Sequence, residues 1–148
     1  MAGQTLTHRR VISVLSTFML ALTLLLVPSS AGADGQSWST VSSPNIGASN
    51  NFLNSVSCVS VHDCTAVGYY NDNTRYGTLI LNWNGTIWTT VTSPNTGAAN
   101  NILNAVTCVS ANDCTAVGSY YDGTRNATLI LRWNGSSWTA ITSPNTGA

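Results

Sequence analysis

Four cysteines are the residues of this 148-residue chain whose type and spacing most directly suggest chemistry. Cys58 and Cys64 enclose five residues, and Cys108 and Cys114 repeat that spacing 50 positions later. Four cysteines allow three pairings. The repeat favours pairing within each copy, Cys58 with Cys64 and Cys108 with Cys114. A loop of this length can join two antiparallel strands, and paired strand ends bring Cα atoms close enough for a disulfide.

Two other uses of the cysteines stay open from the sequence. One is a metal site in which two thiolates are joined by His62 or Asp63. The second copy has Asn112 where the first has His62, so the repeat does not preserve a third soft ligand. The other is a pair of reactive thiols. We expect disulfides, no bound metal and no cofactor.

A second set of residues suits carbohydrate recognition. Tyrosines lie close to an aspartate after each C-T-A-V-G motif. Aromatic rings contact the apolar faces of sugars, and polar side chains hydrogen-bond the hydroxyl groups. Both aspartates mark the turn between the second and third strand-like runs. They faintly resemble oxygen-rich calcium loops, but one carboxylate in each loop is too few to indicate calcium. The candidate ligand-binding residues are Tyr69, Tyr70, Asp72, Tyr120, Tyr121 and Asp122.

No arrangement of residues indicates catalysis. His62 is the one histidine beyond residue 33, and a general base normally needs an orienting partner and a nucleophile. Charged residues make up 7% of the chain, with no lysine and no glutamate. Beyond residue 33, three arginines stand against five aspartates, which gives no electrostatic reason to expect nucleic acid or an anionic membrane as a partner. We therefore predict that the protein is not an enzyme and has no catalytic residues.

The N-terminal residues 1–33 have the order of a secretory signal peptide. His8-Arg9-Arg10 precede a mostly apolar run over residues 11–27, and Ala31-Gly32-Ala33 supply an A-x-A cleavage site. The alternative is an uncleaved anchor, because about 20 apolar residues can span a bilayer. The sequence predicts cleavage after Ala33, an extracellular location and no membrane span in the mature chain.

The remaining residues, 34–148, are organised as a repeat with a period of 50 residues. Each copy holds four strand-like runs rich in β-branched and aromatic residues; in the first copy they cover 53–60, 64–70, 78–83 and 87–92. Asn84-Gly85 separates the last two runs and is a strong hairpin signal. The connector 98–103 is the best candidate for a short helical turn. We divide the region into units of approximately 38–87 and 88–137, with a trailing strand at 138–148.

Four antiparallel strands in about 50 residues is the size of a β-propeller blade. The unit S-V-S-C-V-S-x-x-D-C-T-A-V-G … L-I-L-x-W-N-G-x-x-W resembles repeats of secreted bacterial β-propeller proteins, especially actinobacterial ones. It is loosely similar to kelch and galactose-oxidase-type blades, although the double glycine of kelch repeats is missing. The resemblance covers residues 38–148 and implies an all-β fold of two tandem four-stranded blades, an incomplete propeller, after a signal helix. It implies no particular activity.

Two blades leave unpaired faces, because closed propellers have roughly four to eight blades. Either copies of the chain associate to complete a propeller, or the chain is the opening part of a longer one. Trp88 and Trp138 follow the Asn-Gly turns, and we expect them to pack between blades, with sugar stacking as the alternative.

The function that fits these observations is a secreted, non-enzymatic binding or scaffold module. Its expected partners are a carbohydrate or a cell-surface protein. The alternative is an N-terminal fragment of a larger secreted propeller protein or enzyme whose active residues are absent here. A decayed gene without function is a third interpretation.

Overall fold

The computed structural model describes residues 37, 39–47, 49–97 and 99–146. The signal peptide predicted at residues 1–33, and Trp38 at the start of the first repeat unit, lie outside the described residues. Among the residues that are described, no helix is long and apolar enough to cross a membrane.

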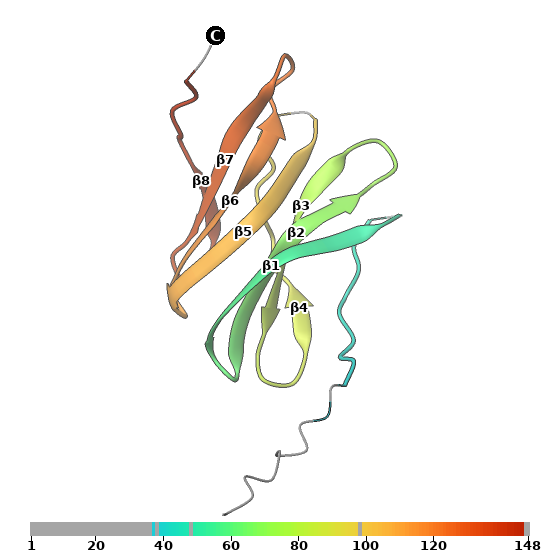
Figure 1. Cartoon of the computed structure of the whole chain (residues 1–148), viewed down its shortest axis with the longest axis vertical. Coiled ribbons are helices and arrows are strands. Elements are labelled where there is room, and N and C mark those ends of the chain that lie inside the picture. The colour runs from blue at the N-terminus through green and yellow to red at the C-terminus, as the bar shows by residue number, and fades with distance from the viewer. Residues whose placement is uncertain (1–36, 38, 48, 98, 147–148) are drawn as a thin grey trace, which may run out of the picture. The chain divides into compact units, whose positions relative to one another are not determined.

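The described region from Thr40 onward is all-β and contains two four-stranded antiparallel sheets (Figure 1). In each sheet the strands are hydrogen-bonded in chain order, so every connection is a hairpin. The first sheet is built from β1 (Asn51–Ser60), β2 (Asp63–Asn71), β3 (Tyr76–Trp83) and β4 (Trp88–Thr90), and the second from β5 (Asn101–Ser110), β6 (Asp113–Tyr121), β7 (Asn126–Trp133) and β8 (Trp138–Ile141). The prediction of two tandem four-stranded antiparallel sheets is confirmed. The sheets run from 51 to 90 and from 101 to 141, whereas the repeat units were counted from residue 38.

The prediction of a helical turn at 98–103 is wrong for residues 101–103, which belong to a strand. Asn101 begins strand β5 and pairs with Tyr120 of β6. The Asn101 side chain is buried, accepts a hydrogen bond from the Thr96 amide at 2.8 Å and donates one to the Ala99 carbonyl at 2.8 Å. This side chain satisfies the backbone of the connector and brings the chain directly into the strand.

The Asn-Gly turns form as the sequence predicts. Gly85 and Gly135 both have a φ of 92°, a conformation that residues with a Cβ rarely adopt. A Cβ on Gly85 would also lie 2.2 Å from the His62 ring nitrogen Nδ1, and one on Gly135 would lie 2.6 Å from the Asn112 side-chain oxygen. His62 and Asn112 therefore pack against the neighbouring hairpin turn, which gives both residues a structural position.

Each sheet has two faces, which we name front and back. The register places Val67 opposite Ile80 on the front face and Ala66 opposite Leu81 on the back face. The back face also includes Leu53, because Leu53 pairs with Gly68, which in turn pairs with Leu79. The second sheet repeats this with Val117, Ile130 and Ile141 in front and with Leu103, Val106, Ala116, Leu129 and Leu131 behind.

The main hydrophobic core joins the front face of the first sheet to the back face of the second. Val67 and Ile80 share one cluster of buried residues with Leu103, Ala116 and Leu129. Burying one such side chain contributes roughly 1.5–3 kcal/mol. Trp138 belongs to this cluster and is 5% exposed, which confirms that this tryptophan packs between the two sheets.

Three hydrogen bonds connect β1 with β5 along the edge of this core, where the two strands lie side by side in Figure 1. The side-chain amide of Asn54 donates to the backbone carbonyl of Leu103 at 2.7 Å. The Ser55 hydroxyl accepts from the Val106 amide at 3.2 Å, and the Ser57 hydroxyl accepts from the Cys108 amide at 3.0 Å. Polar side chains of β1 thus satisfy the exposed backbone edge of β5.

Candidate functional site

The four cysteines form two disulfides, Cys58–Cys64 and Cys108–Cys114. In each sheet the two partners lie directly opposite one another on the first and second strands. This confirms the predicted pairing and leaves no free cysteine among the described residues. No group of three metal-ligating side chains occurs in the part of the chain that the structure describes. Two disulfides in a small domain fit an oxidising, extracellular environment.

The two candidate aspartates hold their own turns. The Asp72 carboxylate accepts hydrogen bonds from the Thr74 hydroxyl, the Thr74 amide and the Arg75 amide, and it pairs with the Arg75 guanidinium at 3.4 Å. The Thr74 hydroxyl makes the largest contribution to lowering the pKa of Asp72 to about 2. The geometry therefore ties Asp72 to the β2–β3 turn.

Asp122 has the same arrangement in the second sheet. Its carboxylate accepts from the amides of Arg125 and Thr124, and its other oxygen lies 3.8 Å from the Arg125 guanidinium. The Arg125 amide is the main cause that lowers the pKa of Asp122 to about 2. Both aspartates thus lie in the turns that the sequence marks between the second and third strands of each sheet.

The four candidate tyrosines lie in different surroundings. Tyr70 packs against the back-face core of the first sheet, and a Cβ on Gly77 would lie 2.6 Å from its ring. Tyr120 packs against the main core. Tyr121 ends β6 and is 37% exposed. Tyr69 lies in a group of three rings, so the structure separates the four tyrosines.

Tyr69 lies between two aromatic residues, and we name Phe52, Tyr69 and Tyr76 the aromatic cluster. The Phe52 and Tyr69 rings are stacked with centroids 4.8 Å apart, and the Tyr69 and Tyr76 rings meet edge to face at 5.1 Å. Phe52 remains 43% exposed. Tyr76 is held at its backbone, where its amide donates to the Asn100 side chain at 2.9 Å.

Sequence reasoning missed Phe52 and Tyr76. Their positions depend on the strand register, which pairs Phe52 with Tyr69 and Asn71 with Tyr76. Simple alternation along β1 would have grouped Phe52 with Val56, which pairs with Ala66 on the back face, so the sequence carried no signal for the observed position of the Phe52 ring. The irregularity between Leu53 and Ser55 brings Phe52 to the face of Tyr69. The cluster belongs to the first repeat alone, because the corresponding residues of the second are Ile102, Ser119 and Asn126.

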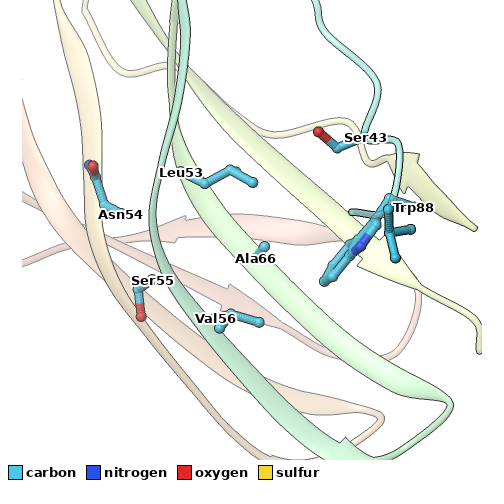
Figure 2. Close-up of a pocket in the computed structure, with 8 residues that line it drawn as sticks. Ser43, Leu53, Asn54, Ser55, Val56, Ala66 and Trp88 are labelled. Atoms are coloured by element: carbon cyan, nitrogen blue, oxygen red, sulfur yellow. The ribbon is translucent and has the colours of Figure 1, made fainter. Parts of the chain in front are cut away.

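A cleft of about 430 Å³ lies on the back face of the first sheet (Figure 2). Figure 2 shows Leu53, Val56 and Ala66 on the same side as the Trp88 ring, whereas Asn54 points toward β5. Trp88 packs beside the back-face core of its sheet, together with Ile46 from the segment that precedes β1. The residues that line the cleft are Val41, Ser43, Leu53, Asn54, Ser55, Val56, Ala66 and Trp88.

Comparison of the chain with protein-family models, with curated proteins and with solved structures gave no match. The aromatic cluster and the cleft are two surfaces of the described residues that could bind a ligand.

Proposed function

We propose that this chain is a secreted, non-enzymatic binding module of the β-propeller-repeat type that recognises carbohydrate through its aromatic cluster. The observation that carries the proposal is the cluster itself, with three rings in contact and Phe52 partly exposed. Rings on a protein surface bind the apolar C–H faces of sugars, and isolated exposed aromatic side chains need no functional explanation, whereas grouped ones indicate recognition.

The scaffold supports this role by holding Phe52 close to β2. A Cβ on Gly68 would lie 1.9 Å from the Phe52 carbonyl oxygen, so the approach of the two strands at this point requires glycine. Tyr69 supports one face of the Phe52 ring. A ring fixed in this way loses little side-chain entropy when a ligand stacks on it.

The chemistry of the region favours a neutral ligand. Beyond residue 33 three arginines stand against five aspartates, a slight negative excess, and the Asp72 and Arg75 side chains near the cluster in sequence are paired with one another. A polyanion would find no excess of positive charge here, and an excess of two negative charges is small for binding a polycation. Neutral oligosaccharides offer apolar faces and hydroxyl groups and need no such excess.

Substitution of Phe52 tests this function. Binding of cellohexaose, chitohexaose and mannohexaose to the exported, oxidised protein is measured by isothermal titration calorimetry. We expect at least one to bind, and Phe52→Ala to weaken binding by about fivefold or more, since a well-placed ring contributes on the order of 1 kcal/mol. Ile102→Ala, at the matching position of the second repeat, is the control and should bind as the unaltered protein does. Absence of binding to all three, or equal binding by both variants, would refute the proposal.

Secretion forms part of the proposal and has its own test. The two disulfides support export, because they persist in oxidising compartments. Mass spectrometry of protein recovered from the medium of an expressing culture should show a chain that begins at Asp34. Retention of the intact chain in the membrane fraction would instead indicate an uncleaved anchor.

A further inference from the structure

Each sheet has one face in the interface between the sheets and one face that is partly exposed. On the back of the first sheet Ala66, Leu79 and Leu81 are buried under neighbouring side chains, whereas Leu53 and Val56 are exposed. The exposed residues of each sheet match residues of the other sheet that are buried in the interface. On the front, Val67 of the first sheet is fully buried, at 0% exposed, while Val117 of the second is 41% exposed. On the back, Leu103 of the second sheet is 0% exposed, while Leu53 of the first is 47% exposed. The exposed front and the exposed back are thus the two halves of an interface that the chain already forms once.

We propose that the back-face cleft of the first sheet is the docking site for the front face of the second sheet of another copy of this chain. In this arrangement Val117 and Ile130 of one copy occupy the cleft of the next, as Val67 and Ile80 occupy the corresponding position within the chain. The argument rests on the continuity of the new contact with the established interface, and it goes beyond carbohydrate recognition because it involves different residues.

The cleft has the residues that this docking requires. Leu53, Val56 and Ala66 line it, and their repeat mates Leu103, Val106 and Ala116 all belong to or pack against the main core. The cleft volume of about 430 Å³ is therefore space that, at the second sheet, is filled by side chains of the first. On the opposite side of the chain, Ile141 is 43% exposed beside Val117 and Ile130, which extends the apolar front.

Most of the polar contacts of the interface can also repeat between copies. Asn104 matches Asn54 and is exposed. Its side-chain amide can therefore donate to the Leu53 carbonyl of the next copy, as the Asn54 side chain donates to the Leu103 carbonyl within one chain. Thr107 matches Ser57 and retains the hydroxyl that would accept from the Cys58 amide. Ala105 matches Ser55 and has no hydroxyl, so one of the three hydrogen bonds is lost.

Head-to-tail docking makes residues 41–46 of one copy compete with residues 141–146 of the docked copy for the same place on the first sheet. Residues 41–46 lie against the first sheet as residues 91–96 lie against the second: Val41 and Ser43 line a cleft with Trp88, and Val91 and Ser93 line one with Trp138. Residues 141–146 of a docked copy would reach this same place. Ile46 is anchored to Asn51 by hydrogen bonds of 2.9 and 2.8 Å.

The trailing segment has weaker anchors than Ile46. Ser143 and Asn145 contact Thr128 through hydrogen bonds that are all exposed. We therefore expect residues 142–146 to lose their contacts with Thr128 and move away when a second copy docks. The Asn45 side chain of the next copy then takes the place of Asn145 beside Thr128.

Such a contact is heterologous, so each copy offers a different surface to each neighbour, and closure gives a ring. Two variants distinguish this arrangement from any symmetric one. Leu53→Asp blocks the back face and Val117→Asp blocks the front face, and both residues are exposed enough for the single chain to fold. Val61→Asp is the matched control, because Val61 is 80% exposed in the turn between β1 and β2 and lies on neither face.

The experiment is light scattering after size-exclusion chromatography of the exported, oxidised chain. The unaltered protein and Val61→Asp should form a discrete oligomer. Each face variant should associate at least about 100-fold more weakly, because a charge would be buried without a partner. An equimolar mixture of the two variants should give a 1:1 dimer, since each retains one intact face. A chain that ends at Ile141 should associate more tightly.

A monomeric unaltered protein would overturn the proposal, and so would association that both face variants retain. Loss of association in both variants without a dimer on mixing would also overturn it, because that result indicates a symmetric contact. Failure of carbohydrate binding with the association pattern intact would refute the proposed function alone.

Discussion

Replacement of Leu103 by alanine is the perturbation that most sharply tests how the two sheets pack. Leu103 is 0% exposed and belongs to the core that joins the sheets, whereas its repeat mate Leu53 is 47% exposed. Removing three carbon atoms from a buried site costs about 2.4 kcal/mol in transfer free energy at ~0.8 kcal/mol for each, and the cavity adds about 1 kcal/mol. We therefore expect Leu103→Ala to lower the free energy of unfolding by about 3–4 kcal/mol.

Leu53→Ala is the matched control for this prediction. About half of the side chain is already in water, and no enclosed cavity forms, so the expected loss is about 1 kcal/mol. Urea unfolding, followed by tryptophan fluorescence, gives both values, and measurements at low micromolar concentration keep association from contributing. For a domain of this size the melting temperature should fall by roughly 12–15 °C for Leu103→Ala and about 4 °C for Leu53→Ala. Equal losses for the two variants would refute the described packing of the sheets.

Two further predictions concern the hairpins. Replacing Cys58 and Cys64 together by serine should lower the free energy of unfolding by about 2 kcal/mol, because the closed loop is short, and urea unfolding checks this value; an unchanged midpoint would contradict a stabilising role for the bond. The pKa of Asp72, lowered to about 2, predicts that its contribution to the β2–β3 turn is complete above the ordinary value of 3.8 and is lost as the pH falls through about 2. Carboxyl-carbon NMR titration measures this midpoint, and Thr74→Val should raise it; titration of the unaltered Asp72 near its ordinary value would refute the turn geometry.

The strands and disulfides could be predicted from sequence because they depend on local signals. Alternation of β-branched residues, Asn-Gly between two runs and a repeated cysteine spacing each act within a few residues. The predicted pairing of Cys58 with Cys64 needed only the repeat and the length of the loop. The strand ends were less accurate, since β1 starts at Asn51 and not at residue 53, and β4 ends at Thr90.

The surfaces could not be predicted because they depend on register and on which face each sheet covers. The register shift between Leu53 and Ser55 decides which β1 side chains share a face with those of β2, and so decides the position of Phe52 beside Tyr69. Near-identical sequences also have opposite exposures, as Val67 and Val117 show. No pattern within a single repeat distinguishes the two valines; the presence or absence of a neighbouring sheet does.

The central claim is that the front face of one copy docks on the back face of another. Nuclear Overhauser effects (NOEs) between different chains test this contact most directly. In a mixture of isotope-labelled and unlabelled protein, isotope-filtered NOE spectra report only contacts between different chains. The front-to-back arrangement predicts NOEs from the Val117 methyl groups of one copy to Leu53 and Val56 of another. NOEs between Val117 residues of two copies, or none between chains at a concentration where light scattering shows an oligomer, would contradict it.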